Sequence, residues 1–208
     1  NTVVMKPATD TPLVVRLLAE CFRDAGLPDG VANYVTGPGR TLGQALIESP
    51  EVDGVTFTGS FDVGMKIFRD FANGAYVRPT ILELGGKNPA IVSRNADLER
   101  AAVGIVRSAF GLQGQKCSAC SRVYIEEPVY EQLVSRLVEL TEKLKAGDPT
   151  DRSVMVGPVV NNSSYQDFKD FTEELSQGGR FLTGGKVLVE GDLAKGYFCA
   201  PTLVADLP

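Results

Sequence analysis

The stretch DGVTFTGSFDVGMKIFRDFA, residues 53–72, decides the fold class. It opens with a short β-rich run that stops at a glycine turn. The remainder places four apolar side chains on one face of a helix, namely Val63, Ile67, Phe68 and Phe71. A strand, a glycine turn and a helix in this order are typical of sheets whose strands alternate with covering helices.

The same alternation runs through the first half of the chain. The β-rich runs, counted with the glycine turns that follow some of them, cover residues 2–6, 31–39, 53–59 and 78–86. Helical patterns lie between them at residues 12–26, 40–49 and 61–72. Strands that alternate with helices predict an α/β fold with a mostly parallel, helix-covered sheet, and glycine-rich turns after such strands are where these sheets bind ligands.

The second half repeats the alternation less regularly. The predicted strands are residues 88–93, 121–127 and a run from 180, and the predicted helices are residues 97–111, 128–147 and 164–179. The glycine pair at residues 85 and 86 is the most plausible boundary between two α/β units. We therefore predict one domain portion at residues 1–84 and a second at residues 85–208.

Composition excludes several classes of protein. The 208 residues carry 21 basic and 26 acidic side chains, a net charge of −5, and show no electrostatic footprint for nucleic acid. No apolar run approaches the roughly 20 residues of a membrane span. Four cysteines favour a reducing compartment, so we expect a cytoplasmic protein, or a mitochondrial matrix protein if the source is eukaryotic. Histidine is absent, which excludes Ser–His–Asp and Cys–His catalysis.

The sequence FTGS at residues 57–60 offers a first candidate site. The N–H groups at a helix N-terminus favour an anion, and Gly59 would let a phosphate approach closely. Ser60 can equally be a simple N-cap of the following helix. The spacing is not that of a G-x-G-x-x-G turn, so this motif is weak by itself.

Glu83 and Cys117 are the residues that could carry covalent chemistry. Glu83 stands in the apolar sequence TILELGG, where a carboxylate without a function is costly, and it could serve as a general base. Its alternative is a solvated carboxylate at a strand end. Cys117 could be a zinc ligand, half of a redox pair with Cys120, a buried core residue or a nucleophile whose thiolate Lys116 would favour. Cys120 is better explained by packing. No metal site is expected.

Five motifs together resemble the aldehyde dehydrogenase superfamily, in the same order and at similar spacing over essentially the whole chain. They are KPATDTP (6–12), TGPGR (36–40), FTGS (57–60), ELGGKNP (83–89) and QGQKCSACSR (113–122). The last motif and AGDPTDRSVMVGPVVN (146–161) look most like the 1-pyrroline-5-carboxylate dehydrogenase branch, which oxidises glutamate γ-semialdehyde. The resemblance implies part of a Rossmann-like NAD(P)-binding domain followed by part of a cysteine-bearing catalytic domain.

The resemblance also implies roles for individual residues. Cys117 matches the nucleophile and Glu83 the general base, and Ser118 matches a contact to the substrate carboxylate. Further residues match positions around the NAD cofactor: Lys6 at the adenosine ribose, Gly39 and Val63 at the adenine, Gly59 and Ser60 at the pyrophosphate, and Leu84 and Gly85 at the nicotinamide. Thr9 stands where the family often has a glutamate, so NADP is possible as well as NAD.

The implied reaction is NAD(P)-dependent oxidation of an aldehyde to a carboxylic acid through a cysteine thiohemiacetal and thioester. Glutamate γ-semialdehyde is the first expected substrate, with succinate semialdehyde or another aldehyde as the alternative. The family's oxyanion-hole asparagine and second nicotinamide-ribose glutamate would fall outside residues 1–208. The chain is therefore expected to be the middle of a longer, homo-oligomeric enzyme, or by itself a non-catalytic nucleotide-binding segment.

Overall fold

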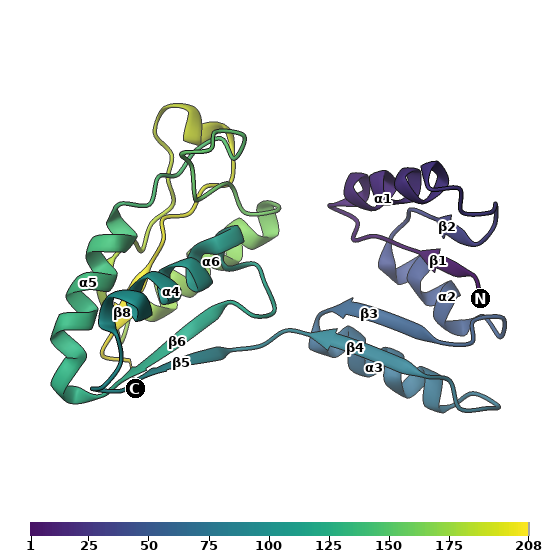
Figure 1. The fold of residues 1–208 in the computed structure, drawn as a ribbon, viewed down its shortest axis with the longest axis horizontal. Coiled ribbons are helices and arrows are strands. Elements are labelled where there is room, and N and C mark those ends of the chain that lie inside the picture. Colours follow the sequence, from purple (N-terminus) through teal and green to yellow (C-terminus); the bar gives the residue numbers. More distant parts are fainter. Residues whose placement is uncertain (208) are drawn as a thin grey trace. The chain divides into compact units, whose positions relative to one another are not determined.

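The computed structural model describes residues 1–207, which form two compact units that divide between Leu84 and Gly85 (Figure 1). The structure thus separates the chain at the glycine pair. That the first unit belongs to a cofactor-binding domain and the second to a catalytic domain stays a prediction.

The first unit alternates strands and helices. Its elements are β1 (Val3–Met5), α1 (Pro12–Asp24), β2 (Ala32–Tyr34), a π-helical turn (Gly39–Gly43), α2 (Gln44–Glu48), β3 (Val55–Gly59), α3 (Phe61–Ala72) and β4 (Thr80–Leu84). β1 pairs with β2 and β3 pairs with β4, both in parallel (Figure 1). Parallel pairing follows from the helix between the two strands of each pair, because that crossover returns the chain to the same end of the sheet.

The core of this unit lies between α2, α3 and the β3–β4 pair. Ile47, Ile67 and Phe71 are buried there, and half-buried side chains of both strands, including Phe57 and Leu82, pack against them. The predicted face of α3 is therefore only half right. Ile67 and Phe71 are buried, whereas the other two members of that face, Val63 and Phe68, are exposed.

Helix α1 leaves most of its apolar face uncovered within its unit. Leu13, Leu17 and Leu18 recur at helical spacing, yet they are 67%, 60% and 45% exposed. Only Phe22 on this face is half-buried. The spacing correctly predicted the helix, which starts at Pro12 as expected and ends at Asp24 rather than at residue 26. It did not predict the exposure of its apolar stripe.

The second unit contains β5 (Asn88–Val92), α4 (Leu98–Phe110), β6 (Cys120–Ile125), α5 (Tyr130–Glu142), α6 (Asn162–Ser176), β7 (Arg180–Thr183) and β8 (Leu203–Ala205), with short 3₁₀ turns at Gly111–Gly114, Glu127–Val129 and Gly191–Lys195. β5 and β6 pair in parallel (Figure 1). β7 and β8 pair antiparallel. Helix α5 is shorter than the predicted helix over residues 128–147, because residues 145–147 leave the helix and pair with Val156.

The core of the second unit is formed by α4, α5 and β5. Val92, Ile105, Val106, Leu133 and Leu137 are buried in one cluster, and side chains of β6 and β8 pack against it. Burying side chains of this kind contributes roughly 1.5–3 kcal/mol each. This cluster fixes α4, which leads directly into the segment that carries Cys117.

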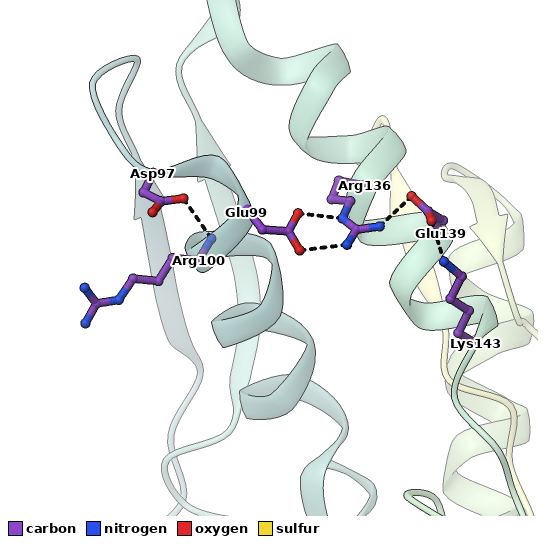
Figure 2. A network of polar contacts seen from close by, with 6 residues as sticks. All are labelled: Asp97, Glu99, Arg100, Arg136, Glu139 and Lys143. Carbon is purple, nitrogen blue, oxygen red and sulfur yellow. Dashed lines mark hydrogen bonds and ion pairs between the residues drawn. The ribbon is translucent and has the colours of Figure 1, made fainter.

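An ion-pair network joins α4 to α5 on the surface of this core (Figure 2). The Arg136 guanidinium donates to both carboxylate oxygens of Glu99, at 2.7 Å each, and also to Glu139 at 2.6 Å. Lys143 donates to the other oxygen of Glu139. Asp97 caps the N-terminus of α4 by accepting from the Arg100 N–H at 3.0 Å.

The parallel strand pairs and intervening helices confirm the predicted α/β class. Within residues 1–207, no helix is both long enough and apolar enough to cross a membrane.

Candidate active site

The candidate cofactor residues of the first unit lie where parallel strands end. Lys6 follows β1, and Gly39 lies in the turn after β2. Gly59 ends β3, and Ser60 follows it as the N-cap of α3. The β3–β4 register places Gly59 beside Leu84 and Thr58 beside Glu83. Carboxyl ends of parallel strands are the usual ligand-binding edge of an α/β sheet, so this topology favours a ligand site at these residues.

Helix α3 begins directly after the candidate residue Ser60. Ser60 is its N-cap, as the sequence predicted, and the Ser60 hydroxyl accepts from the Val63 N–H at 3.4 Å. The first N–H groups of a helix have no acceptor within the helix, and the helix dipole adds positive potential there. The donor set therefore suits a phosphate, although the exposed Asp62 in the same turn opposes a negative charge.

A groove of about 520 Å³ opens beside the ends of β1 and β2. Its lining is mostly apolar and includes Pro7, Thr9, Leu13, Tyr34, Thr36 and Pro38. The candidate residue Thr9 faces this groove, and the candidates Lys6 and Gly39 each adjoin one of its lining residues in the sequence. A volume of this size with a mostly apolar lining is typical of a small-molecule site.

Glu83 is exposed within its unit, which corrects the expectation of an apolar environment. Side chains of a strand alternate between its two faces, so Leu82 and Leu84 turn toward α3 while Ile81 and Glu83 turn away from it. The apolar neighbours in the sequence therefore lie mostly on the opposite face of β4. The carboxylate is accessible, as a base that activates water must be.

Cys117 lies in the second unit, in a turn between α4 and β6. Pairing of Asn88 with Cys120 starts the β5–β6 ladder, and the register shifts between Asn88 and Pro89. The Asn88 amide donates to the Cys117 carbonyl at 2.7 Å and to the Ala119 carbonyl at 3.1 Å. The start of β5 thereby fixes the main chain on both sides of Ser118, an exposed residue.

Gly86 allows this close approach of the two segments. A Cβ atom at Gly86 would lie 3.2 Å from the Cys117 carbonyl oxygen and 3.0 Å from the Asn88 side chain. The side chain of Cys117 is exposed. Among residues 1–207, no acceptor takes the Cys117 backbone N–H, so this donor is available to a substrate oxygen.

A left-handed backbone turn precedes the cysteine. Leu112, Gln113 and Gly114 have φ of 53°, 57° and 72°. Leucine and glutamine in this region cost roughly 1–2 kcal/mol each, and such strain persists only where surrounding contacts enforce it. Gly114 tolerates the conformation, and a Cβ there would lie 2.9 Å from the Ala109 carbonyl oxygen.

The other three cysteines differ from Cys117. Cys120 is half-buried and packs against the core cluster, as predicted. Cys199 is buried, and burial raises the pKa of its thiol to about 11. Cys21 is exposed on α1. In the part of the chain that the structure describes, no three Cys, Asp or Glu side chains gather in a way that could hold a metal ion.

The structure places the candidate residues at three sites. Lys6, Thr9 and Gly39 lie at the β1–β2 pair and the groove beside it. Glu83, Leu84, Gly59 and Ser60 share one sheet end in the first unit, and Gly85 begins the second unit, which holds Cys117 and Ser118. Sequence reasoning missed Asn88, although the motif ELGGKN contains it. The available signal was an asparagine side chain at the start of a predicted strand, shortly after two glycines.

The whole chain, residues 1–208, matches the model of the aldehyde dehydrogenase family. The chain belongs to that family. Among curated aldehyde dehydrogenase relatives, the 1-pyrroline-5-carboxylate dehydrogenase of Geobacillus sp. strain WCH70 is 46% identical over 211 residues, and the 1-pyrroline-5-carboxylate dehydrogenase 1 of Halalkalibacterium halodurans is 44% identical over 214. Each match covers all of this chain and 40% of the relative.

Solved aldehyde dehydrogenase structures also resemble this chain. The 1-pyrroline-5-carboxylate dehydrogenase from Thermus with bound NAD superposes with a TM-score of 0.92 at 38% identity, covering all of this chain and 40% of that one. An NAD-dependent aldehyde dehydrogenase from Sinorhizobium meliloti gives 0.93 at 36% identity, with the same coverage. The chain thus spans about two fifths of the length of the relatives it matches.

Proposed function

We propose that the protein containing this chain oxidises an aldehyde to a carboxylic acid with NAD(P), through a covalent intermediate on Cys117, and that its substrate is L-glutamate γ-semialdehyde. One observation carries the proposal. Cys117 is exposed and stands on a turn fixed by Asn88, and its own backbone N–H has no acceptor within residues 1–207. The relatives named 1-pyrroline-5-carboxylate dehydrogenase support the choice of substrate.

In the proposed first step, the Cys117 thiolate attacks the aldehyde carbon. The carbonyl oxygen becomes an oxyanion, and the Cys117 backbone N–H donates to it. One such donor typically contributes about 3 kcal/mol to transition-state stabilisation. Ser118, exposed beside the nucleophile, contacts the carboxylate of the substrate.

Transfer of a hydride from the thiohemiacetal carbon to the bound cofactor would leave a thioester on Cys117. Glu83 acts as the general base for the hydrolysis of that thioester. It takes a proton from water, whose oxygen then attacks the thioester carbon, and the Cys117 thiolate leaves as the acid is released. General-base catalysis of this kind contributes roughly 10²- to 10⁴-fold to the rate.

The residues of the first unit fit an NAD(P) cofactor. Ser60 and the α3 N-terminus suit its pyrophosphate, and the exposed Val63 one turn further suits the adenine. Lys6, Thr9 and Gly39 lie at or beside the groove and are assigned to the adenosine. When bound, the nicotinamide supplies the hydride acceptor, and Leu84 and Gly85 lie at the strand end assigned to it.

The experiment compares variants of the protein in its full natural length by the appearance of NADH with L-glutamate γ-semialdehyde. Cys117→Ala is expected to abolish the rate, whereas the exposed Cys21→Ala is the matched control. Glu83→Gln is expected to keep the single-turnover burst of NADH and to lose about 10²-fold or more of its steady-state rate. The exposed Glu51→Gln is the matched control and is expected to keep the steady-state rate.

An undiminished rate in Cys117→Ala would refute the proposed nucleophile. Parallel assays with succinate semialdehyde and with NADP test the substrate and the cofactor separately. A higher kcat/KM for succinate semialdehyde would keep the reaction and change the substrate. A cytoplasmic location and a homo-oligomeric state are part of the same proposal.

A further inference from the structure

The left-handed turn before Cys117 is held by two glutamine side chains. The Leu112 carbonyl, at the start of the turn, accepts from the Gln115 backbone N–H at 3.0 Å and from the Gln115 side-chain amide at 3.2 Å. The oxygen of the same side chain accepts from the Val160 N–H at 3.0 Å. Gln115 therefore ties the turn to a segment 45 residues further along the chain.

Gln113 makes the same type of bridge. The hydrogen-bond pattern assigns the orientation of its amide: the oxygen accepts from the Gly157 N–H at 2.7 Å, and the nitrogen donates to the Leu112 carbonyl at 3.3 Å. Both amides thus donate to Leu112 and accept from residues 157–160. Only a side chain that has both a donor and an acceptor can form this bridge, which explains glutamine at the two positions.

Residues 157–160 form a firm support for the turn. Val156 and Val159, on either side of Gly157 and Pro158, are buried. The Val156 N–H donates to the Lys145 carbonyl at 3.1 Å, and the Val159 N–H donates to the Tyr197 carbonyl at 2.8 Å. Gly157 itself is buried. A strained turn attached to such a segment cannot relax without breaking the attachment.

We propose that Gln113 and Gln115 are positioning residues for the nucleophile, which hold Cys117 in its reactive place by bridging Leu112 to residues 157–160. This role rests on the proposed function of Cys117. Neither side chain touches the substrate or the cofactor in this assignment. They act through the backbone that connects Gln115 to Cys117, two residues further along.

The test uses Gln113→Met, Gln115→Met and the double variant in the full-length protein. Methionine keeps the unbranched shape of glutamine and removes both hydrogen bonds. We expect kcat to fall about 10- to 100-fold in the double variant, while KM for NAD stays within about twofold. Gln132→Met, on the exposed side of α5, is the matched control and is expected to keep the original kcat.

Gln115→Glu provides the conservative variant. Its carboxylate still accepts from Val160 but cannot donate to Leu112, so its kcat is expected to lie between those of the original protein and Gln115→Met. The melting temperature is recorded for each variant. The inference would be overturned if the double variant and Gln132→Met had the same kcat. It would also be overturned if the loss of kcat were fully explained by a smaller fraction of folded protein.

A second measurement separates this inference from the proposed function. The rate at which iodoacetamide alkylates Cys117 is followed by mass spectrometry, which needs no aldehyde substrate. We expect the rate in the double variant to differ at least about threefold from that in Gln132→Met, because the thiol changes its surroundings. Equal alkylation rates would overturn the inference even in an active enzyme. A changed rate in a protein without aldehyde activity would support positioning and refute the proposed reaction.

Discussion

At the scale of single residues, two buried threonines show how the surroundings of a hydroxyl decide its effect on stability. The Thr172 hydroxyl in α6 lies 2.9 Å from both the Phe168 and the Lys169 carbonyl oxygens, which share its single proton. Thr141 in α5 is only 3% exposed, and its hydroxyl has no partner among residues 1–207. A buried polar atom without a partner destabilises the folded state.

Thr141→Val should therefore stabilise the protein. Valine has the same shape and removes the unpaired hydroxyl, so we expect the free energy of unfolding to rise by about 1 kcal/mol. Thr172→Val is the control and should lower it by a similar amount, because its hydroxyl is paired. Urea denaturation followed by circular dichroism measures both. A loss of stability in Thr141→Val would contradict this assignment.

The residues that set the backbone around Cys117 were the least predictable from sequence. Leucine and glutamine have no preference for positive φ, so nothing local at residues 112 and 113 indicates a left-handed turn. The turn depends on hydrogen bonds to residues 157–160, a separation that sequence periodicity does not report. The Ser60 cap, by contrast, is a local feature and was predicted correctly.

At the scale of elements, the ion pairs between α4 and α5 make their contact depend on pH. Hydrogen bonds from Lys143 and Arg136 lower the pKa of Glu139 to about 2, and those from Arg136 also lower the pKa of Glu99. A carboxylate with a lowered pKa stabilises the folded state above its ordinary pKa, near 4.5. That stabilisation is lost as the pH falls from about 4.5 toward 2.

Arg136→Gln should lower the melting temperature modestly at pH 7, because all the charges involved are at the surface and partly screened by solvent. The difference from the original protein should shrink as the pH falls below 4.5, and also in high salt. The difference in melting temperature is measured by thermal unfolding of both proteins between pH 7 and pH 3. Arg100→Gln serves as the control, since the Arg100 side chain points away from the network in Figure 2. A difference that grows toward low pH would contradict the prediction.

Element positions were more predictable than their packing. The predicted helix over residues 61–72 coincides with α3, because a glycine turn and a capping serine mark its start. The apolar stripe of α1 is exposed within its unit, because spacing identifies the apolar face of a helix but not what covers it. The 128–147 helix was predicted too long, because pairing of residues 145–147 with Val156 competes with the helix.

At the scale of the whole molecule, the four cysteines should differ in reactivity. Cys199 is buried and has a pKa raised to about 11, so roughly one thousandth of it is thiolate at pH 8. Cys117 is exposed. We expect a thiol reagent at pH 8 to modify Cys117 well before Cys199, and Cys199 to react mainly after unfolding or as the pH approaches 11.

Peptide mapping of the modified protein at successive times measures this order. Denaturation in urea is the control, since it should make the two thiols react at comparable rates. If Cys199 were modified as early as Cys117 in the folded protein, the prediction would be contradicted, because the Cys199 thiol would then be accessible to solvent. Composition alone favoured a reducing compartment for all four cysteines but could not rank them, because exposure is a property of the fold.

The hydrogen bonds that tie the turn before Cys117 to residues 157–160 have a consequence for the synthesis of the protein. Residues 157–160 are held partly by the Tyr197 carbonyl, which is translated about 80 residues after Cys117. When Cys117 leaves the ribosome, Tyr197 has not yet been made. The growing chain therefore lacks the contact that holds residues 157–160. The turn before Cys117 gains its full support only after Tyr197 has been made, so shorter nascent chains would carry this cysteine on a turn that is not yet held in place.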